Sequence, residues 1–126
     1  MAEIICTANA PVPAGPYSQA LIADNLIFCS GQLGIDPSDG KLVQGSLAEE
    51  ASQCLINLSA VLIAAGSSLS AVVKTTVFVT DLAQFKGINE TYARFFKEGP
   101  PARSTVQVSA LPLGARVEIE AVAVKT

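Results

Sequence analysis

Pro101-Ala102-Arg103-Ser104-Thr105 opens a predicted strand with a forked cation, directly behind two consecutive prolines. The prolines stiffen the approach and fix the direction in which the Arg103 side chain leaves the backbone. Residues 104–108 are expected to continue as a short strand, with Arg103, Thr105 and Gln107 on one face. A guanidinium at the mouth of a strand suits a carboxylate ligand, whereas a surface ion pair is the ordinary role of an arginine. The rest of the chain has to decide between these two roles.

Length and charge limit the class of protein. The 126 residues, of which 50% are hydrophobic, predict one domain over residues 1–126 with a buried core. A net charge of −3 and eight scattered Lys and Arg residues give no basic surface for phosphates, so nucleic acid is not an expected partner. No apolar run approaches the roughly 20 residues of a membrane span, and no membrane partner is expected. We therefore expect a soluble, cytoplasmic protein.

The reactive side chains exclude several kinds of site. Cys6, Cys29 and Cys54 are odd in number and share no metal-ligand spacing, so buried free thiols are expected rather than disulfides or a metal site. The sequence contains no histidine, which removes Ser-His and Cys-His nucleophiles and the commonest metal ligand. Acid and base chemistry is therefore left to carboxylates, tyrosine, lysine or backbone groups.

The hydrophobic patterns predict strands and two helices. The capping box that begins at Ser46 starts a helix with apolar residues at helical period, and Gly66 stops it. A second helix is expected from Phe85 to Phe96, and the Gly-Pro-Pro that follows ends it. Residues 72–80 are apolar on both faces apart from Lys74 and the threonines, which predicts a strand covered on both sides. The other strands are expected at residues 3–6, 17–22, 26–30, 104–108 and 116–124.

The last strand carries carboxylates on one of its two faces. Glu118 and Glu120 share a face with Arg116 and two valines, while the opposite face is core. Because two helices can cover only one face of such a sheet, the mixed face is expected to meet another subunit and to approach an Arg103 there. An ion pair of the glutamates with Arg116 or Lys125 is the alternative. A carboxylate held beside a positive charge stays ionised, which suits activation of water.

Six short segments of the sequence occur in an order that is typical of one protein family, although each segment alone is a weak signal. With them, the sequence resembles the reactive intermediate deaminase A family (RidA, also called YjgF-like) from near its first residue to near its last. The segments are Ala14-Gly15-Pro16-Tyr17-Ser18-Gln19-Ala20, Ser30-Gly31-Gln32, Val73-Lys74-Thr75-Thr76-Val77, Ile88-Asn89-Glu90-Thr91-Tyr92, Pro101-Ala102-Arg103-Ser104 and Val117-Glu118-Ile119-Glu120-Ala121.

The resemblance implies a fold, an assembly and a reaction. The fold is an α+β, chorismate-mutase-like (YjgF-like) mixed six-stranded sheet with two helices packed on one face. Three subunits would form a homotrimer with an active site in each cleft between neighbours. The family hydrolyses 2-imino acids such as 2-iminobutanoate and 2-iminopropanoate, the enamine and imine products of pyridoxal-phosphate enzymes, to 2-oxo acids and ammonia. No cofactor and no metal is implied.

The resemblance also implies roles for individual residues. Arg103 would bind the substrate carboxylate, and Glu118 would hold or deprotonate the attacking water. Tyr17 would lie in the cleft with its hydroxyl free. Thr105 stands where many members have a cysteine, so a thiol-dependent role at this position is not expected. The residues that would shape the substrate-binding pocket are Ser30, Gly31, Asn89 and Thr105.

Two functions of other classes remain as alternatives. One is a non-catalytic trimer of the same family that binds small carboxylates or regulates a partner, and the presence of both Arg103 and Glu118 argues against it. The other is a nuclease or translation-inhibiting role sometimes attached to the family. The acidic charge and the absence of histidine make the second alternative the weaker one.

Overall fold

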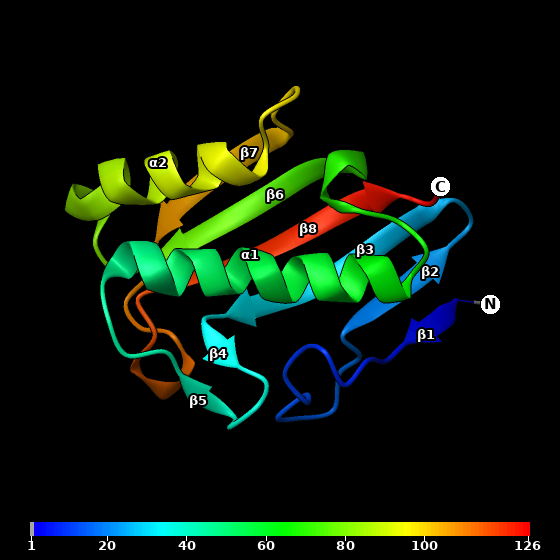
Figure 1. Ribbon diagram of the computed structural model, residues 1–126, viewed down its shortest axis with the longest axis horizontal. Helices are drawn as coiled ribbons and strands as arrows, with labels where there is room; N and C mark the ends of the chain where they lie inside the picture. The colour runs from blue at the N-terminus through cyan, green and yellow to red at the C-terminus, as the bar shows by residue number, and fades with distance from the viewer. Residues whose placement is uncertain (1) are drawn as a thin grey trace.

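Strand β8 (Val117–Val124), the last in the chain, lies inside a six-stranded sheet of order β1-β2-β3-β8-β6-β7. The computed structural model describes residues 2–126. In that part of the chain β1 (Glu3–Ile5), β2 (Ala20–Ala23), β3 (Leu26–Leu33), β8 and β6 (Val72–Val79) pair antiparallel, and β7 (Ala102–Gln107) pairs parallel to β6. The expected mixed six-stranded α+β sheet is confirmed (Figure 1).

Two helices form the second layer of the fold. Helix α1 (Leu47–Ala64) begins at the predicted capping box, in which Ser46 and Glu49 exchange side-chain hydrogen bonds with each other's backbone N–H. Gly66 follows it with φ +80°, a conformation that glycine adopts without strain. Helix α2 (Phe85–Phe95) carries its apolar residues on one face. Single turns of 3₁₀-helix lie at Leu69–Ala71, Leu82–Gln84 and Pro112–Gly114.

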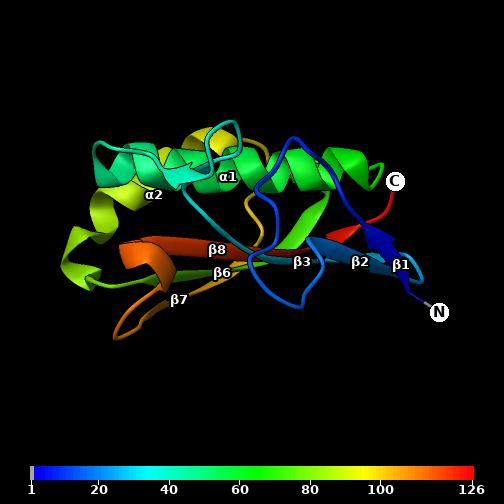
Figure 2. The same cartoon turned by 90° about the horizontal axis from the view of Figure 1, so that it is seen from below.

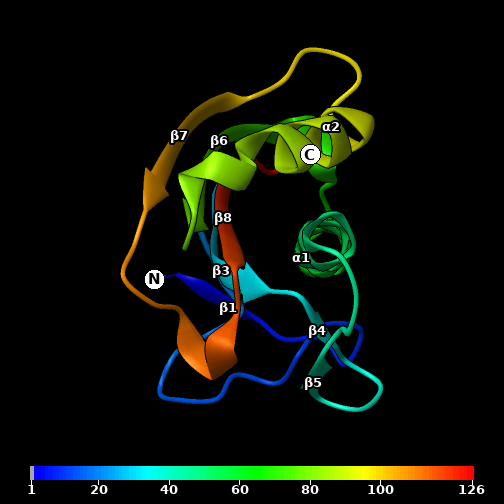
Figure 3. The ribbon, with the colours of Figure 1, turned by 90° about the vertical axis from the view of Figure 1, so that its left-hand side faces the viewer.

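The core lies between the sheet and the two helices. Seen from below and end-on, α1 and α2 lie on one side of the sheet, and no helix of the described chain lies on the other side (Figures 2 and 3). Residues alternate along β8 between buried side chains and side chains that are half-buried or exposed. We call the side that bears α1 and α2 the helix face and the opposite side the open face. The open face carries exposed apolar side chains, namely Leu21, Phe28, Val73 and Val106.

Several local expectations are corrected by the structure. Strand β2 begins at Ala20, so Tyr17 belongs to the preceding loop rather than to the strand. Strand β3 continues to Leu33 past a bulge, and an unpredicted hairpin of β4 (Ile35–Asp36) and β5 (Lys41–Leu42) follows it. Within a single chain, β6 is buried on one face only, because nothing in residues 2–126 covers its open face. Cys6 is exposed, whereas Cys29 and Cys54 are buried free thiols as expected.

Helix α1 is the core helix of the domain. Its 18 residues are by length and mean hydropathy able to cross a membrane, which the sequence pattern did not indicate. Its apolar stripe, with Leu55, Leu58 and Leu62 fully buried, packs against β3 and β8. The burial of that stripe in the protein core accounts for the hydropathy of the helix.

An ion pair between α1 and the start of β8 replaces the predicted pairing of Arg116. Glu50 is only 3% exposed and accepts hydrogen bonds from the Arg116 backbone N–H at 2.7 Å and from its Nε at 2.8 Å. The guanidinium also donates to the Gly45 carbonyl at 3.0 Å. The alternative in which Arg116 pairs with Glu118 or Glu120 is therefore wrong, because the Arg116 side chain is directed to the helix layer.

Candidate active site

Arg103 lies on the helix face of strand β7, beneath helix α2. The parallel register places Arg103 beside Thr75, a fully buried residue of β6. The guanidinium carbon lies 4.8 Å from the ring centroid of Tyr92 and 5.2 Å from that of Phe85. Within residues 2–126 the guanidinium forms no ion pair with a carboxylate. The surface ion pair considered for this arginine is therefore not present in the described chain.

Two polar atoms without hydrogen-bond partners accompany the arginine. Asn89 lies four residues after Phe85 and three before Tyr92, so all three side chains share one face of α2. The buried Asn89 Oδ1 has no hydrogen-bond partner in the described chain. The same holds for Thr105 Oγ1, which follows Arg103 by two residues on the same face of β7. We call Arg103, Thr105 and Asn89 the arginine group; its polar atoms are available to a ligand or to a second chain.

Glu118 lies on the open face of the sheet. It is paired with Phe78 of β6 and Leu33 of β3, and its side chain is half-buried. Burial raises the pKa of Glu118, and the charge of neighbouring Glu120 raises it further. The sequence predicted the opposite influence, a cation that would keep this carboxylate ionised. A raised pKa brings a carboxyl group closer to neutrality, where it can both accept and return a proton.

Gly31 provides the space that the Glu118 side chain occupies. The pairing of β3 with β8 shifts register between Cys29 and Gln32, so Ser30 and Gly31 lie in a bulge. A Cβ atom on Gly31 would lie 2.8 Å from Glu118 Cδ and 3.0 Å from Cγ. The bulge at Gly31 and the close approach of the Glu118 side chain to its backbone are thus the same feature.

Ser30 and Tyr17 are joined through the loop before β2. Ser30 Oγ donates to the Ser18 carbonyl at 2.6 Å, and the Ser30 N–H donates to the Gln19 carbonyl at 3.0 Å. Tyr17, the residue before Ser18, is 52% exposed, and its hydroxyl accepts from the Ala14 N–H at 3.2 Å. The hydroxyl predicted to be free therefore already has one partner. We call Glu118, Gly31, Ser30 and Tyr17 the glutamate group.

The sheet separates the two groups. Register and burial place the Arg103 side chain on the helix face, whereas that of Glu118 lies on the open face. A single chain therefore does not bring the guanidinium and the carboxylate to one substrate. Chemistry that uses both side chains requires Arg103 of one chain to meet Glu118 of another.

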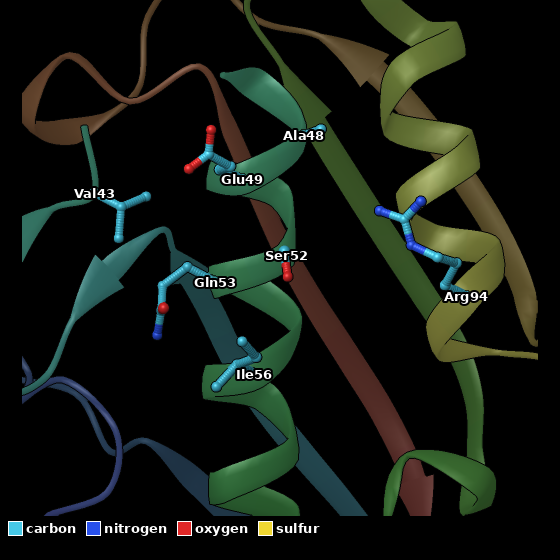
Figure 4. Close-up of a pocket in the computed structure, with 7 residues that line it drawn as sticks. All are labelled: Val43, Ala48, Glu49, Ser52, Gln53, Ile56 and Arg94. Atoms are coloured by element: carbon cyan, nitrogen blue, oxygen red, sulfur yellow. The ribbon is translucent and has the colours of Figure 1, made fainter. Parts of the chain in front are cut away.

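The depressions of the surface lie elsewhere. One of about 320 Å³ at the end of α2 is lined by residues such as Leu69, Phe95 and Lys97. A groove of about 310 Å³ between α1, α2 and the segment after β5 is lined by Glu49, Ser52, Gln53 and Ile56, and Arg94 points from α2 toward α1 across it (Figure 4). It contains no residue of either group. A smaller hollow of about 170 Å³ on the open face includes Lys74 and Glu120. The candidate site is thus defined by its side chains and not by a closed cavity.

Three residues next to the site were not predicted as site residues. Gln19 is 2% exposed, and it ties the loop that bears Tyr17 through hydrogen bonds to Thr7 and Pro11. An amide directly after a proline-rich loop is its only sequence signal. Phe85 and Tyr92 were assigned to the core stripe of α2. Their contact with Arg103 depends on the packing of α2 on β7, which periodicity does not reveal.

Comparisons with known proteins identify the family and the fold of the chain. The model of the family described as Endoribonuclease L-PSP matches residues 7–125. A human protein named 2-iminobutanoate/2-iminopropanoate deaminase is 52% identical, covering 98% of this chain and 90% of the human one. The crystal structure of yeast Mmf1 is 40% identical with a TM-score of 0.96, covering 100% of both chains. That of Escherichia coli TdcF with bound serine is 39% identical with a TM-score of 0.93, covering 98% of this chain and 99% of the other. The chain belongs to the endoribonuclease L-PSP family, the YjgF/RidA family.

Proposed function

We propose that this protein is a 2-iminobutanoate/2-iminopropanoate deaminase, a hydrolase that converts 2-imino acids to 2-oxo acids and ammonia. The observation that carries the proposal is the Arg103 guanidinium, which lies against two aromatic rings and is paired with no carboxylate of the described chain. A planar fork of this kind suits the carboxylate of a small acid. The names of relatives at about 50% identity point to the same reaction.

In the proposed mechanism, Arg103 binds and Glu118 handles the protons. Two parallel hydrogen bonds from Arg103 hold the substrate carboxylate and orient the imine carbon. Glu118 takes a proton from water as the water oxygen bonds to that carbon, which gives a carbinolamine. With the imine entering protonated, return of that proton to the carbinolamine nitrogen gives an ammonium leaving group, and Glu118 accepts the hydroxyl proton as ammonia leaves and the carbonyl forms. The raised pKa of Glu118 suits this transfer in both directions, and no step requires a cofactor or a metal.

The two-sided geometry supports a shared active site. Because Arg103 and Glu118 lie on opposite faces of one sheet, we propose a homotrimer in which the arginine group of one subunit faces the glutamate group of its neighbour. Exposed apolar side chains on the open face, such as Phe28 at 46% exposure, provide a surface for subunit contact. Light scattering at micromolar concentration tests the assembly, and a monomeric mass would contradict the shared site.

The pocket residues have defined parts in this proposal. Asn89 Oδ1 and Thr105 Oγ1 are unpaired in the described chain, so they are free to bind the imine nitrogen or the attacking water. Gly31 leaves the space that the Glu118 side chain occupies, and Ser30 fixes the bulge next to it through its hydrogen bonds to the Ser18 and Gln19 carbonyls. Tyr17 closes the cleft through its ring and exposed edge. The bound serine of E. coli TdcF supports a ligand of the size and charge of a small amino acid.

The test generates 2-iminobutanoate in place from threonine with a dehydratase and traps surviving imine with semicarbazide. Added wild-type protein is expected to lower the trapped fraction and to raise 2-oxobutanoate. Arg103→Ala and Glu118→Gln are expected to abolish this effect while remaining folded. Arg94→Ala is the matched control, because this arginine is exposed and lines the groove outside the site. Its activity is expected to equal that of wild type.

The same variants distinguish the alternatives. A non-catalytic carboxylate-binding trimer predicts that wild type leaves the trapped imine unchanged, while 2-oxobutanoate binds and Arg103→Ala abolishes the binding. The nuclease alternative predicts an RNA-cleaving activity that copurifies with the protein and is absent from Arg103→Ala. We further propose a cytoplasmic location, which the three free thiols support because reducing compartments keep cysteines unpaired. Fractionation of cells expressing the protein tests the location.

A further inference from the structure

We propose that Tyr92 and Phe85 are positioning residues for the reaction, because they hold the guanidinium of Arg103 in the orientation that binds the substrate carboxylate. The inference rests on the proposed function. It assigns the aromatic face of α2 a role beyond core packing, namely recognition of the acid group of the substrate.

The distances place the guanidinium close to two aromatic rings. Phe85 and Tyr92 are seven residues apart on α2, which separates their backbones by about 10 Å along the helix axis. The guanidinium carbon lies 5.2 Å from the first ring centroid and 4.8 Å from the second. Both distances fall within the range of about 6 Å in which a cation is attracted by an aromatic face. The guanidinium is therefore in contact with two aromatic rings of α2 at the same time.

Tyr92 is itself fixed from below. Its hydroxyl shares a hydrogen bond of 2.7 Å with Thr75 Oγ1, and both residues are buried. Thr75 is the β6 partner of Arg103 in the parallel register. The Tyr92 ring also packs against the ring of Phe96, with centroids 4.6 Å apart. The ring that contacts the guanidinium is thus anchored to the strand next to Arg103, and it cannot turn away without breaking a buried hydrogen bond.

This arrangement leaves the hydrogen-bonding edge of the arginine free. Contact with an aromatic face uses the π surface of the guanidinium, whereas its N–H donors point outward in the plane of the group. An arginine on an edge strand without such contacts would sample many rotamers and would lose that freedom on binding. The two rings restrict the rotamers in advance, so less conformational entropy is lost when a carboxylate binds.

The effect is expected in binding rather than in the chemical step. Arg103 holds the substrate carboxylate equally in the ground state and the transition state, so a loss of its orientation is expected to raise KM and to leave kcat unchanged. We expect Tyr92→Leu to raise the KM for 2-iminobutanoate about tenfold, and Phe85→Leu about fivefold, with kcat within about twofold of wild type. Tyr92→Phe keeps the ring and loses only the bond to Thr75, so it is expected to restore most of the affinity.

The experiment measures KM and kcat in the trapping assay, and the dissociation constant of 2-oxobutanoate by calorimetry, for the three variants. Phe95→Leu is the matched control, since this partly buried ring of α2 packs against the core and is not one of the two rings that contact the Arg103 guanidinium. Thermal melting at fixed protein concentration reports folding. Phe85 is less buried than Tyr92, so its variant keeps the test valid if Tyr92→Leu fails to fold.

The outcomes are distinguishable from those that test the proposed function. Inactive wild type would contradict the deaminase itself. Active wild type, with Tyr92→Leu and Phe85→Leu folded and unchanged in KM and in 2-oxobutanoate affinity, would overturn the positioning role. A fall in kcat at constant KM, or an equal rise in KM for Phe95→Leu, would also overturn it, since either result indicates general distortion of the domain.

Discussion

Replacement of Gly31 by alanine should separate catalysis from stability. The added Cβ would lie 2.8 Å from Glu118 Cδ and 3.0 Å from Cγ, against a normal carbon contact of about 3.5–4.0 Å. The carboxylate must therefore move by roughly 0.5–1 Å. A displacement of about 1 Å in a catalytic group can lower the rate about 10²-fold. We expect kcat/KM of Gly31→Ala to fall by about that factor.

Stability should change little in the same variant. Glu118 is half-buried and forms no hydrogen bond with another described residue, so its side chain can swing toward solvent. The free energy of unfolding in urea is expected to fall by less than about 1 kcal/mol. Gly87→Ala on α2 is the control, because a Cβ there meets no atom within 4 Å and alanine favours helix. Wild-type activity in a folded Gly31→Ala protein would refute the placement of Glu118 over Gly31 as the basis of its catalytic geometry.

Four further predictions follow from the electrostatics and the packing. Glu120→Gln removes a charge that raises the pKa of Glu118, so the acid limb of the kcat/KM profile is expected to move to lower pH; an unmoved limb would contradict Glu118 as the base. Because folding raises the pKa of Glu118, the contribution of this carboxyl group to stability is fully present below its unfolded pKa and is lost as the pH rises through its folded pKa. Glu118→Gln should therefore raise the melting temperature more at pH 8 than at pH 4. Glu50→Ala leaves the Arg116 N–H without its hydrogen-bond partner. It is therefore expected to lower the free energy of unfolding, measured in urea at fixed protein concentration, by about 2–4 kcal/mol. A loss below about 0.5 kcal/mol, the size expected of a surface substitution, would refute the structural role of this ion pair. Phe28→Glu puts a charge on the open face, so light scattering should report a monomer and imine hydrolysis should be lost; an active oligomer would place the subunit contact elsewhere.

Local pattern was sufficient for most of the elements. The capping box at Ser46, the helical period that follows and the glycine stop at Gly66 depend on residues within a few turns of one another, and α1 begins and ends where they indicate. The alternation along β8 likewise depends on neighbours only. Tyr17 was misplaced because strand pairing begins only at Ala20, where β1 and β3 supply partners distant in sequence.

Glu50 shows how a sequence pattern can conceal a structural role. It occupies the buried side of α1, where a carboxylate is costly unless it is paired. Its partner Arg116 lies 66 residues later. Sequence patterns could indicate the anomaly of a charge on an apolar stripe, but they could not indicate which cation resolves it. The alternative that was considered therefore paired Arg116 with the nearest carboxylates on its own strand.

The sequence by itself determined the class of fold, the identity of the candidate residues and the alternation that places Glu118 on the face of its strand opposite the core. It also determined that Arg103 and Thr105 share a face of β7. Only the tertiary structure decided that this face is the one beneath α2, while Glu118 lies on the other side of the sheet. The physical reason is that local sequence distinguishes the two faces of a strand but does not determine which face meets the helices and which meets the open side of the sheet. Their assignment depends on the parallel register of β6 with β7 and on helix packing, both of which join residues distant in the chain.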